Sequence, residues 1–92
     1  MNPANYYFFI KQIIARWKVE AGVFEPIHFK HTDEMDEETC EILKHTIKIF
    51  TSRPGLLIGR YGKLVEKYRE IFKEYYHGTD VEIEFIETND WV

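Results

Sequence analysis

The sequence contains little cysteine and no long apolar run. Cys40 is its one cysteine, so a disulfide bond within the chain is excluded and a cytoplasmic setting fits. No apolar stretch approaches the roughly 20 residues that a membrane-spanning helix needs, and we therefore expect no membrane partner. The 45% apolar and 16% aromatic content is typical of one small packed domain, which we assign to residues 1–92.

The spacings that mark metal sites and catalytic sites are also missing. His28, His31, His45 and His77 match no zinc-binding motif such as H-x-x-E-H or C-x-x-C. Cys40 has no neighbouring motif that would make it a nucleophile. The sequence therefore predicts no metal site, no cofactor and no enzymatic activity.

Acidic residues are concentrated near the middle of the chain, where six of them fall between Asp33 and Glu41. Their spacing is not that of an EF-hand, and the glycine which that loop requires is absent. We predict that these residues form a solvated loop within an acidic inter-strand segment, residues 32–44, with a short helix capped by Asp36 as an option. Six carboxylates would repel phosphate, so we expect this stretch not to touch nucleic acid.

Basic residues gather in the part of the chain that follows. The net charge of the whole chain is −4, but residues 44–73 hold eight basic and two acidic side chains. That segment carries +6, and the rest of the chain carries −10. Because clustered positive charge matters more than the total when the partner is a polyanion, this distribution favours nucleic acid.

The apolar periodicity predicts three helical pieces and three strands. Their expected ranges are helix 5–21, strand 24–32, strand 46–52, short helix 54–58, helix 63–77 and strand 80–88. We predict an α+β fold with one three-stranded sheet and the helices packed on one face.

The first helix carries more aromatic residues than one buried stripe needs. Tyr6, Ile10 and Trp17 share one helical face, whereas Tyr7, Phe8 and Phe9 spread around the others. We expect these three aromatics to widen the apolar stripe under the sheet. A partner-binding patch at this end of the chain is the alternative.

Two closely spaced glycines, Gly59 and Gly62, stand in front of the helix expected from Lys63. The pattern lacks the G-K-[ST] ending of a Walker A loop and the first glycine of a dinucleotide fingerprint. A glycine loop between two helices can bring the backbone close to a phosphate chain, because glycine has no Cβ and helix N-termini favour anions. The alternative is a helix cap followed by a turn, with no ligand.

The stretch R-P-G-L-L-I-G-R-Y-G-K-L-V-E-K-Y-R, residues 53–69, closely resembles the signature of the KH domain, an RNA-binding module. The core pattern I-G-x-x-G-x-x-[IV] matches at Ile58, Gly59, Gly62 and Val65. The chain is most similar to the type II form found in the small-subunit ribosomal protein three, whose leading helix and strand resemble I-I-A-R-W-K-V-E-A-G and the residues after it. The resemblance implies a three-stranded mixed sheet in the order helix–strand–strand–helix–helix–strand.

The resemblance also implies a function, which is binding of about four nucleotides of single-stranded RNA beside the glycine loop. Single-stranded DNA and a wider ribonucleoprotein complex are further partners that it allows. The residues that it marks are Ile58, Gly59, Arg60, Tyr61, Gly62, Lys63, Arg53, Val65 and Lys67. Their expected roles are phosphate contact by the loop amides and basic side chains, with Arg53 and Lys67 as the weaker contacts, an apolar floor under the bases, and base stacking by the loop tyrosine. A core position for Ile58 and Val65, and a protein contact for Tyr61, are the alternatives. The alternative is a KH fold that serves as a protein-interaction scaffold with weak or no RNA binding.

Overall fold

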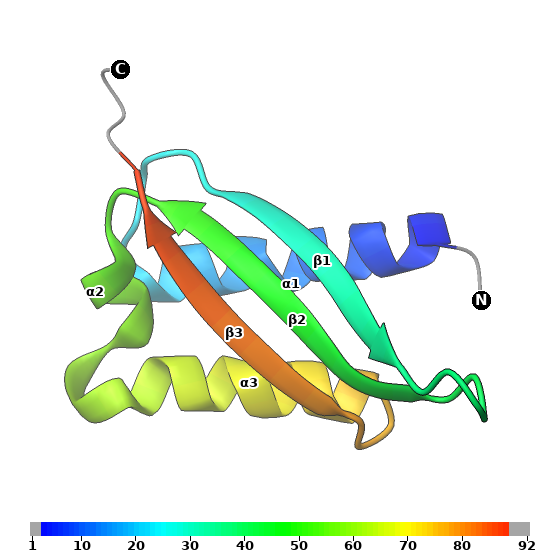
Figure 1. Ribbon diagram of the computed structural model, residues 1–92. Helices are drawn as coiled ribbons and strands as arrows, with labels where there is room; N and C mark the ends of the chain where they lie inside the picture. The colour runs from blue at the N-terminus through cyan, green and yellow to red at the C-terminus, as the bar shows by residue number, and fades with distance from the viewer. Residues whose placement is uncertain (1–2, 89–92) are drawn as a thin grey trace.

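The computed structural model of the chain describes residues 3–88 as three helices, a short 3₁₀ turn and one sheet (Figure 1). In chain order the elements are α1 (Pro3–Ala21), β1 (His28–Met35), β2 (Ile42–Thr51), α2 (Pro54–Ile58), the 3₁₀ turn η1 (Arg60–Gly62), α3 (Lys63–Tyr75) and β3 (Asp80–Glu87). No helix in this described part has the length and apolar character needed to cross a membrane.

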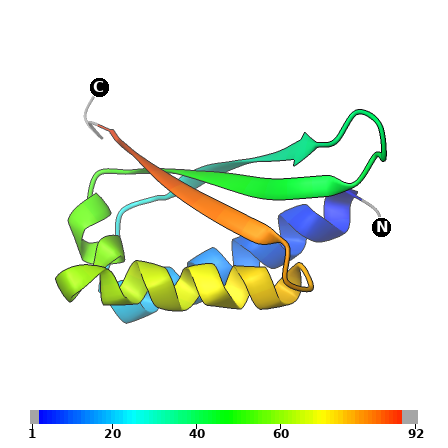
Figure 2. The ribbon, with the colours of Figure 1, turned by 60° about the horizontal axis from the view of Figure 1, so that its bottom comes forward.

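The sheet has the order β1-β2-β3 and is mixed. β1 and β2 form an antiparallel hairpin, and β3 lies parallel to β2 at the other edge. A parallel neighbour requires a crossover connection, which α2 and α3 supply. Figures 1 and 2 show α1 and α3 side by side, running in opposite directions, both against the same face of the sheet. The predicted α+β architecture, with a three-stranded mixed sheet covered on one face, is confirmed.

The core lies between this sheet face and the helices. Alternate residues of β2, such as Ile47 and Ile49, are fully buried, as expected for a strand with one covered face. The Trp17 ring of α1 stacks on Tyr68 of α3, with ring centroids 5.1 Å apart. The Trp17 indole Nε1–H donates a buried hydrogen bond of 2.9 Å to the carbonyl oxygen of Leu57. This bond ties α2, and therefore the loop that follows it, to the core.

The acidic stretch differs from its prediction. The expected solvated loop at 33–41 is confirmed only over residues 36–41, because β1 continues through Met35 and β2 begins at Ile42. The optional short helix capped by Asp36 is wrong, since a turn stands there. The connection between strands is a tight turn over 36–41 rather than the segment 32–44. The Asp36 carboxylate accepts hydrogen bonds from the backbone N–H groups of Glu38 (2.8 Å) and Thr39 (3.3 Å). Asp36 thus closes a turn of the kind that competes with helix formation.

The aromatic residues of α1 also differ in part from expectation. Tyr7 and Phe8 are each 57% exposed and Phe9 is 43% exposed, so they do not form a stripe buried under the sheet. Tyr7 packs near Phe29, with ring centroids 5.1 Å apart. Phe9 packs near Tyr75, at 4.6 Å, and near Phe8, at 6.0 Å. α1 therefore presents a partly exposed aromatic surface.

Candidate nucleic-acid interface

The glycine loop, Gly59–Gly62, connects α2 to α3 and needs glycine at its first position for two reasons. Gly59 has φ 78° and ψ 173°, a backbone region that essentially only glycine adopts. A Cβ atom at Gly59 would also lie 2.6 Å from the Cβ atom of Leu64. The first turn of α3 therefore packs directly on the bare backbone of Gly59.

Two other loop positions, Tyr61 and Gly62, are left-handed but open. Gly62 has φ 71°, and a Cβ atom there would meet nothing within 4 Å. Tyr61 also has a positive φ, 59°, which costs a residue with a side chain about 1–2 kcal/mol. The Tyr61 side chain is 88% exposed. The loop thus holds a large aromatic ring in solvent on a strained backbone, which packing alone does not explain.

The loop uses part of its own hydrogen-bonding capacity internally. The Gly59 N–H donates to the carbonyl oxygen of Gly55 (3.0 Å), and the Gly62 N–H donates to the carbonyl oxygen of Gly59 (3.1 Å). The Lys63 N–H donates to the carbonyl oxygen of Arg60. These bonds fix the loop shape, and they leave the amides of Arg60 and Tyr61 as the loop donors that a ligand would meet.

Most of the basic segment is neutralised in the folded chain. Five of its eight basic side chains form ion pairs within 4.0 Å: Lys44, Arg53, Lys67, Arg69 and Lys73. Within the described residues, Lys48, Arg60 and Lys63 form no such pair. Lys48 lies on the open face of the sheet, while Arg60 and Lys63 are exposed at the glycine loop. The positive charge available to a ligand is therefore concentrated at the loop rather than spread over the segment.

Two predicted contact residues, Arg53 and Lys67, are among the paired ones. Arg53 Nε lies 3.2 Å from a carboxylate oxygen of Glu25, and Lys67 Nζ lies 2.9 Å from Glu20. The hydroxyl of Tyr68 also donates to Glu20, over 2.6 Å. This hydrogen bond, with Lys67, lowers the pKa of Glu20, whereas burial raises the pKa of Tyr68 to about 12. Glu20 therefore stays ionised and holds Lys67 on the α1 side of α3.

An apolar groove of about 390 Å³ runs between α3 and β3, beside the glycine loop. Its apolar lining residues are Ile58, Val65, Val81, Ile83 and Phe85, and its charged lining residues are Glu66, Arg69 and Glu82. Glu66 pairs with Arg69, and Glu82 pairs with Lys44 at 2.8 Å. The carboxylates beside the groove are therefore partnered. β3 is an edge strand, so the groove is open along one side.

The structure brings two predicted floor residues, Ile58 and Val65, together in this groove. The β3 side, with Ile83 and Phe85, was missed by sequence reasoning. Alternation in strand 80–88 marks these side chains as facing inward, but no local pattern shows that β3 runs parallel to β2 next to α3. The signal that could have found them is the crossover geometry of the helix–helix–strand order.

A comparison with protein-family models finds one for the KH domain that matches residues 18–91. No curated protein and no solved structure gives a significant match. The matched range includes the end of α1, the whole sheet, the glycine loop and α3. With a match over most of its length, the chain belongs to the KH domain family, a family of nucleic-acid-binding modules.

Proposed function

We propose that this protein is a type II KH domain that binds single-stranded RNA in the groove between α3 and β3, with the phosphate chain passing the glycine loop. One observation carries the proposal, which is that the loop places its unpaired cations, Arg60 and Lys63, beside an apolar groove open at a sheet edge. The element order α1-β1-β2-α2-α3-β3 supports the type II form. The resemblance to the ribosomal protein's domain extends to the order of elements and to residues 53–69.

Each part of the site has a task in this proposal. The amides of Arg60 and Tyr61 donate to phosphate oxygens, and the side chains of Arg60 and Lys63 add charge-assisted contacts. Bases lie over the apolar floor that includes Ile58 and Val65, where unstacked bases bury their faces. Tyr61 stacks on one base, a contact worth about 1–3 kcal/mol when it forms. Arg53 and Lys67 contribute less, because their ion pairs would have to be given up.

KH domains are RNA-binding modules and are not typically enzymes, and we assign this chain no catalytic role. Single-stranded DNA is the alternative ligand, since phosphate contact and stacking do not need a 2′-hydroxyl. A second candidate function is protein binding through α1, which the exposed Tyr7, Phe8 and Phe9 favour. The cytoplasm is the location that we propose, on the basis of the single cysteine, which is free and exposed.

The test is fluorescence anisotropy with short single-stranded RNAs, and with DNA of the same sequences, on two matched double variants. Arg60→Asp with Tyr61→Asp replaces one cation and one aromatic residue in the loop. Lys11→Asp with Phe8→Asp makes the same change on the exposed side of α1. Asp tolerates the left-handed backbone at position 61 better than Tyr does, so the loop variant should keep its folding.

We expect the loop pair to weaken RNA binding at least about tenfold, because it removes charge-assisted contacts worth about 1.5–3 kcal/mol. The α1 pair should bind RNA like the parent. Thermal unfolding of the same samples checks that both are folded. Unchanged binding in a folded loop variant would reject the RNA role. Loss of a protein partner in the α1 pair alone would support the scaffold function instead.

A further inference from the structure

A second group of functional side chains lies on the helix-covered face of the sheet, near the β1–β2 turn. His31 and Asp33 come from β1, and His45 comes from β2. Asp33 and His45 are directly opposite in the antiparallel register, and His31 lies two residues before Asp33 on the same face. We call His31, Asp33 and His45 the histidine cluster.

Three polar atoms of the histidine cluster form a tight triangle. Asp33 Oδ1 lies 2.9 Å from His31 Nε2 and 2.7 Å from His45 Nδ1. The two imidazole nitrogens are themselves 3.0 Å apart. All three edges of the triangle are therefore of hydrogen-bonding length, although the atoms come from three side chains.

Protons alone cannot satisfy this triangle. Each imidazole nitrogen carries at most one hydrogen, and the ionised carboxylate carries none, so at most two protons serve three contacts. If both nitrogens donate to Asp33, their N–H groups face each other across 3.0 Å. If only one of the two nitrogens is protonated, the lone pair of the other nitrogen faces the carboxylate oxygen, and the contact between those two atoms has no hydrogen bond. One cation at the centre would accept lone pairs from all three atoms at once.

The atom types and separations match those of a divalent metal site. Zinc binds imidazole nitrogen and carboxylate oxygen at about 2.0–2.2 Å. Three such ligands lie about 3.4 Å from one another around a tetrahedral ion, which is the usual zinc geometry. On one face of an octahedron, at about 90°, they lie about 3.0 Å from one another. The observed separations of 2.7, 2.9 and 3.0 Å are close to this value. Two histidines and one carboxylate are also a ligand set that leaves coordination positions open.

Aromatic packing holds the ligands in place. The Tyr76 ring stacks on His45, with centroids 3.7 Å apart and an interplanar angle of 15°, and it lies nearly parallel to His31. Tyr6 of α1 packs against the same rings. His45 is 3% exposed. In metal sites, the residues packed around the ligands fix the orientation of each imidazole ring and therefore determine which nitrogen faces the ion.

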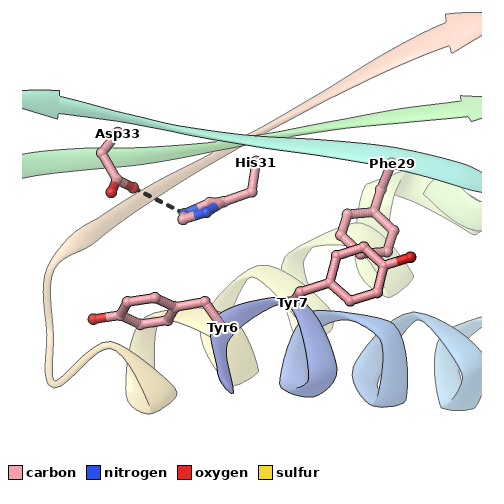
Figure 3. Close-up of a pocket in the computed structure, with 5 residues that line it drawn as sticks. All are labelled: Tyr6, Tyr7, Phe29, His31 and Asp33. Atoms are coloured by element: carbon pink, nitrogen blue, oxygen red, sulfur yellow. Dashed lines mark ion pairs between the residues drawn. The ribbon is translucent and has the colours of Figure 1, made fainter. Parts of the chain in front are cut away.

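The histidine cluster also opens to one side. His31 and Asp33 line a hollow of about 330 Å³ together with Tyr6, Tyr7 and Phe29. Figure 3 shows the side chains of His31 and Asp33 facing into this hollow from β1. Water could complete the coordination of an ion from that hollow.

We propose that His31, Asp33 and His45 bind one divalent first-row transition-metal ion, with Zn²⁺ as the expected occupant. The site is separate from the nucleic-acid groove. It lies at the Tyr76 end of α3, whereas the glycine loop precedes the Lys63 end, about 20 Å away at 1.5 Å per helical residue. The sequence showed no zinc motif because the ligands are brought together by strand register rather than by spacing along the chain.

The test uses the full chain without a histidine tag, freed of metal with a chelator. Zn²⁺ is titrated by isothermal calorimetry, and Co²⁺ absorption reports on the ligand geometry. We compare the parent with Asp33→Asn and His31→Gln. The control is His28→Gln, an exposed histidine on the opposite face of β1. Asp33→Asn keeps the side-chain size at a position 31% exposed, so it should fold even if histidine variants do not.

We expect one Zn²⁺ per parent chain, a raised melting temperature with Zn²⁺, and a loss of affinity of at least about tenfold in both ligand variants, as even removal of supporting groups costs 10–100-fold. His28→Gln should bind like the parent. The proposal is overturned if the parent binds no Zn²⁺. It is equally overturned if folded Asp33→Asn keeps the parental affinity, or if His28→Gln loses as much as the ligand variants.

Discussion

The glycine loop and the histidine cluster lie at opposite ends of α3 and differ in how the chain builds them. The loop residues are consecutive, from Gly59 to Gly62, and their backbone geometry is set by neighbours within a few positions. The histidine cluster joins side chains 14 residues apart through the register of an antiparallel pair. A site of the first kind leaves a motif in the sequence, while a site of the second kind becomes visible only when the strands are paired.

The two regions also use charge differently. At the loop, Arg60 and Lys63 stay exposed while five other cations of the same segment are neutralised by acids. In the histidine cluster the groups face one another under an aromatic cover. Exposed cations suit an extended polyanion that approaches from solvent, whereas converging lone pairs suit a small cation.

The largest effect is expected at Gly59. Gly59→Val should destabilise the fold by about 3 kcal/mol, because a β-branched residue is forced to a positive φ and its Cβ overlaps Leu64. The matched variant is Gly62→Ala, where φ is also positive but the space is open, and it should cost only about 1–2 kcal/mol. Urea unfolding at equilibrium measures both. Equal losses of stability in the two variants would mean that contact with Leu64 of α3 is not the reason why position 59 requires glycine.

A second prediction concerns the independence of the two ends. The Arg60→Asp, Tyr61→Asp variant should lose RNA binding at least about tenfold and keep parental Zn²⁺ affinity. Asp33→Asn should do the reverse, because the two sites share no residue and about 20 Å of helix separates them. Calorimetry and anisotropy on the same protein samples give both affinities. If each variant lowered both affinities, the two ends of α3 would form one coupled unit rather than two independent sites.

The fold was largely predictable because its elements carry local signals. The period of Leu64, Tyr68 and Phe72 marks a helical face that packs on the core, and alternation in Ile47 and Ile49 marks a one-sided strand. The acidic stretch was misread because six carboxylates look like a solvated loop. These residues can still pair as strands, because the side chain of Glu34 faces solvent on the open face of the sheet and its carboxylate is not buried.

The candidate site was predictable where it is contiguous and not where it depends on pairing. The cations of residues 44–73 were counted correctly, but five of them have partners distant in the chain or on the next helical turn, such as Glu25 for Arg53. Ion pairs between distant residues leave no periodic signature. Ile83 and Phe85, which complete the groove, lie beside Val65 because of the crossover from α3 to β3, and no local pattern in strand 80–88 shows this placement.

The salt dependence of RNA binding should reveal how many cations are available. Two phosphate contacts to a single strand give a slope of log K against log salt of about −1.4, and four contacts give about −2.8. Because Arg53 and Lys67 are held in ion pairs, we expect about two phosphate contacts and the shallower slope of about −1.4. Lys63→Ala should reduce the slope by about 0.7, whereas Lys67→Ala should leave it unchanged. A parental slope near zero would contradict phosphate contact by the loop.

The smallest effect is expected at Tyr61, where stability and binding should change in opposite directions. Asn tolerates a positive φ better than Tyr does, so Tyr61→Asn should stabilise the fold by about 0.5–1 kcal/mol by relieving the backbone at φ 59°. The side chain is 88% exposed, and little packing is lost. If the ring stacks on a base, the same change should weaken RNA binding by about 1 kcal/mol, or roughly fivefold. A gain in stability with unchanged RNA affinity would show that Tyr61 does not contact RNA. The proposed contact at the loop would then consist of its backbone amides and its basic side chains alone.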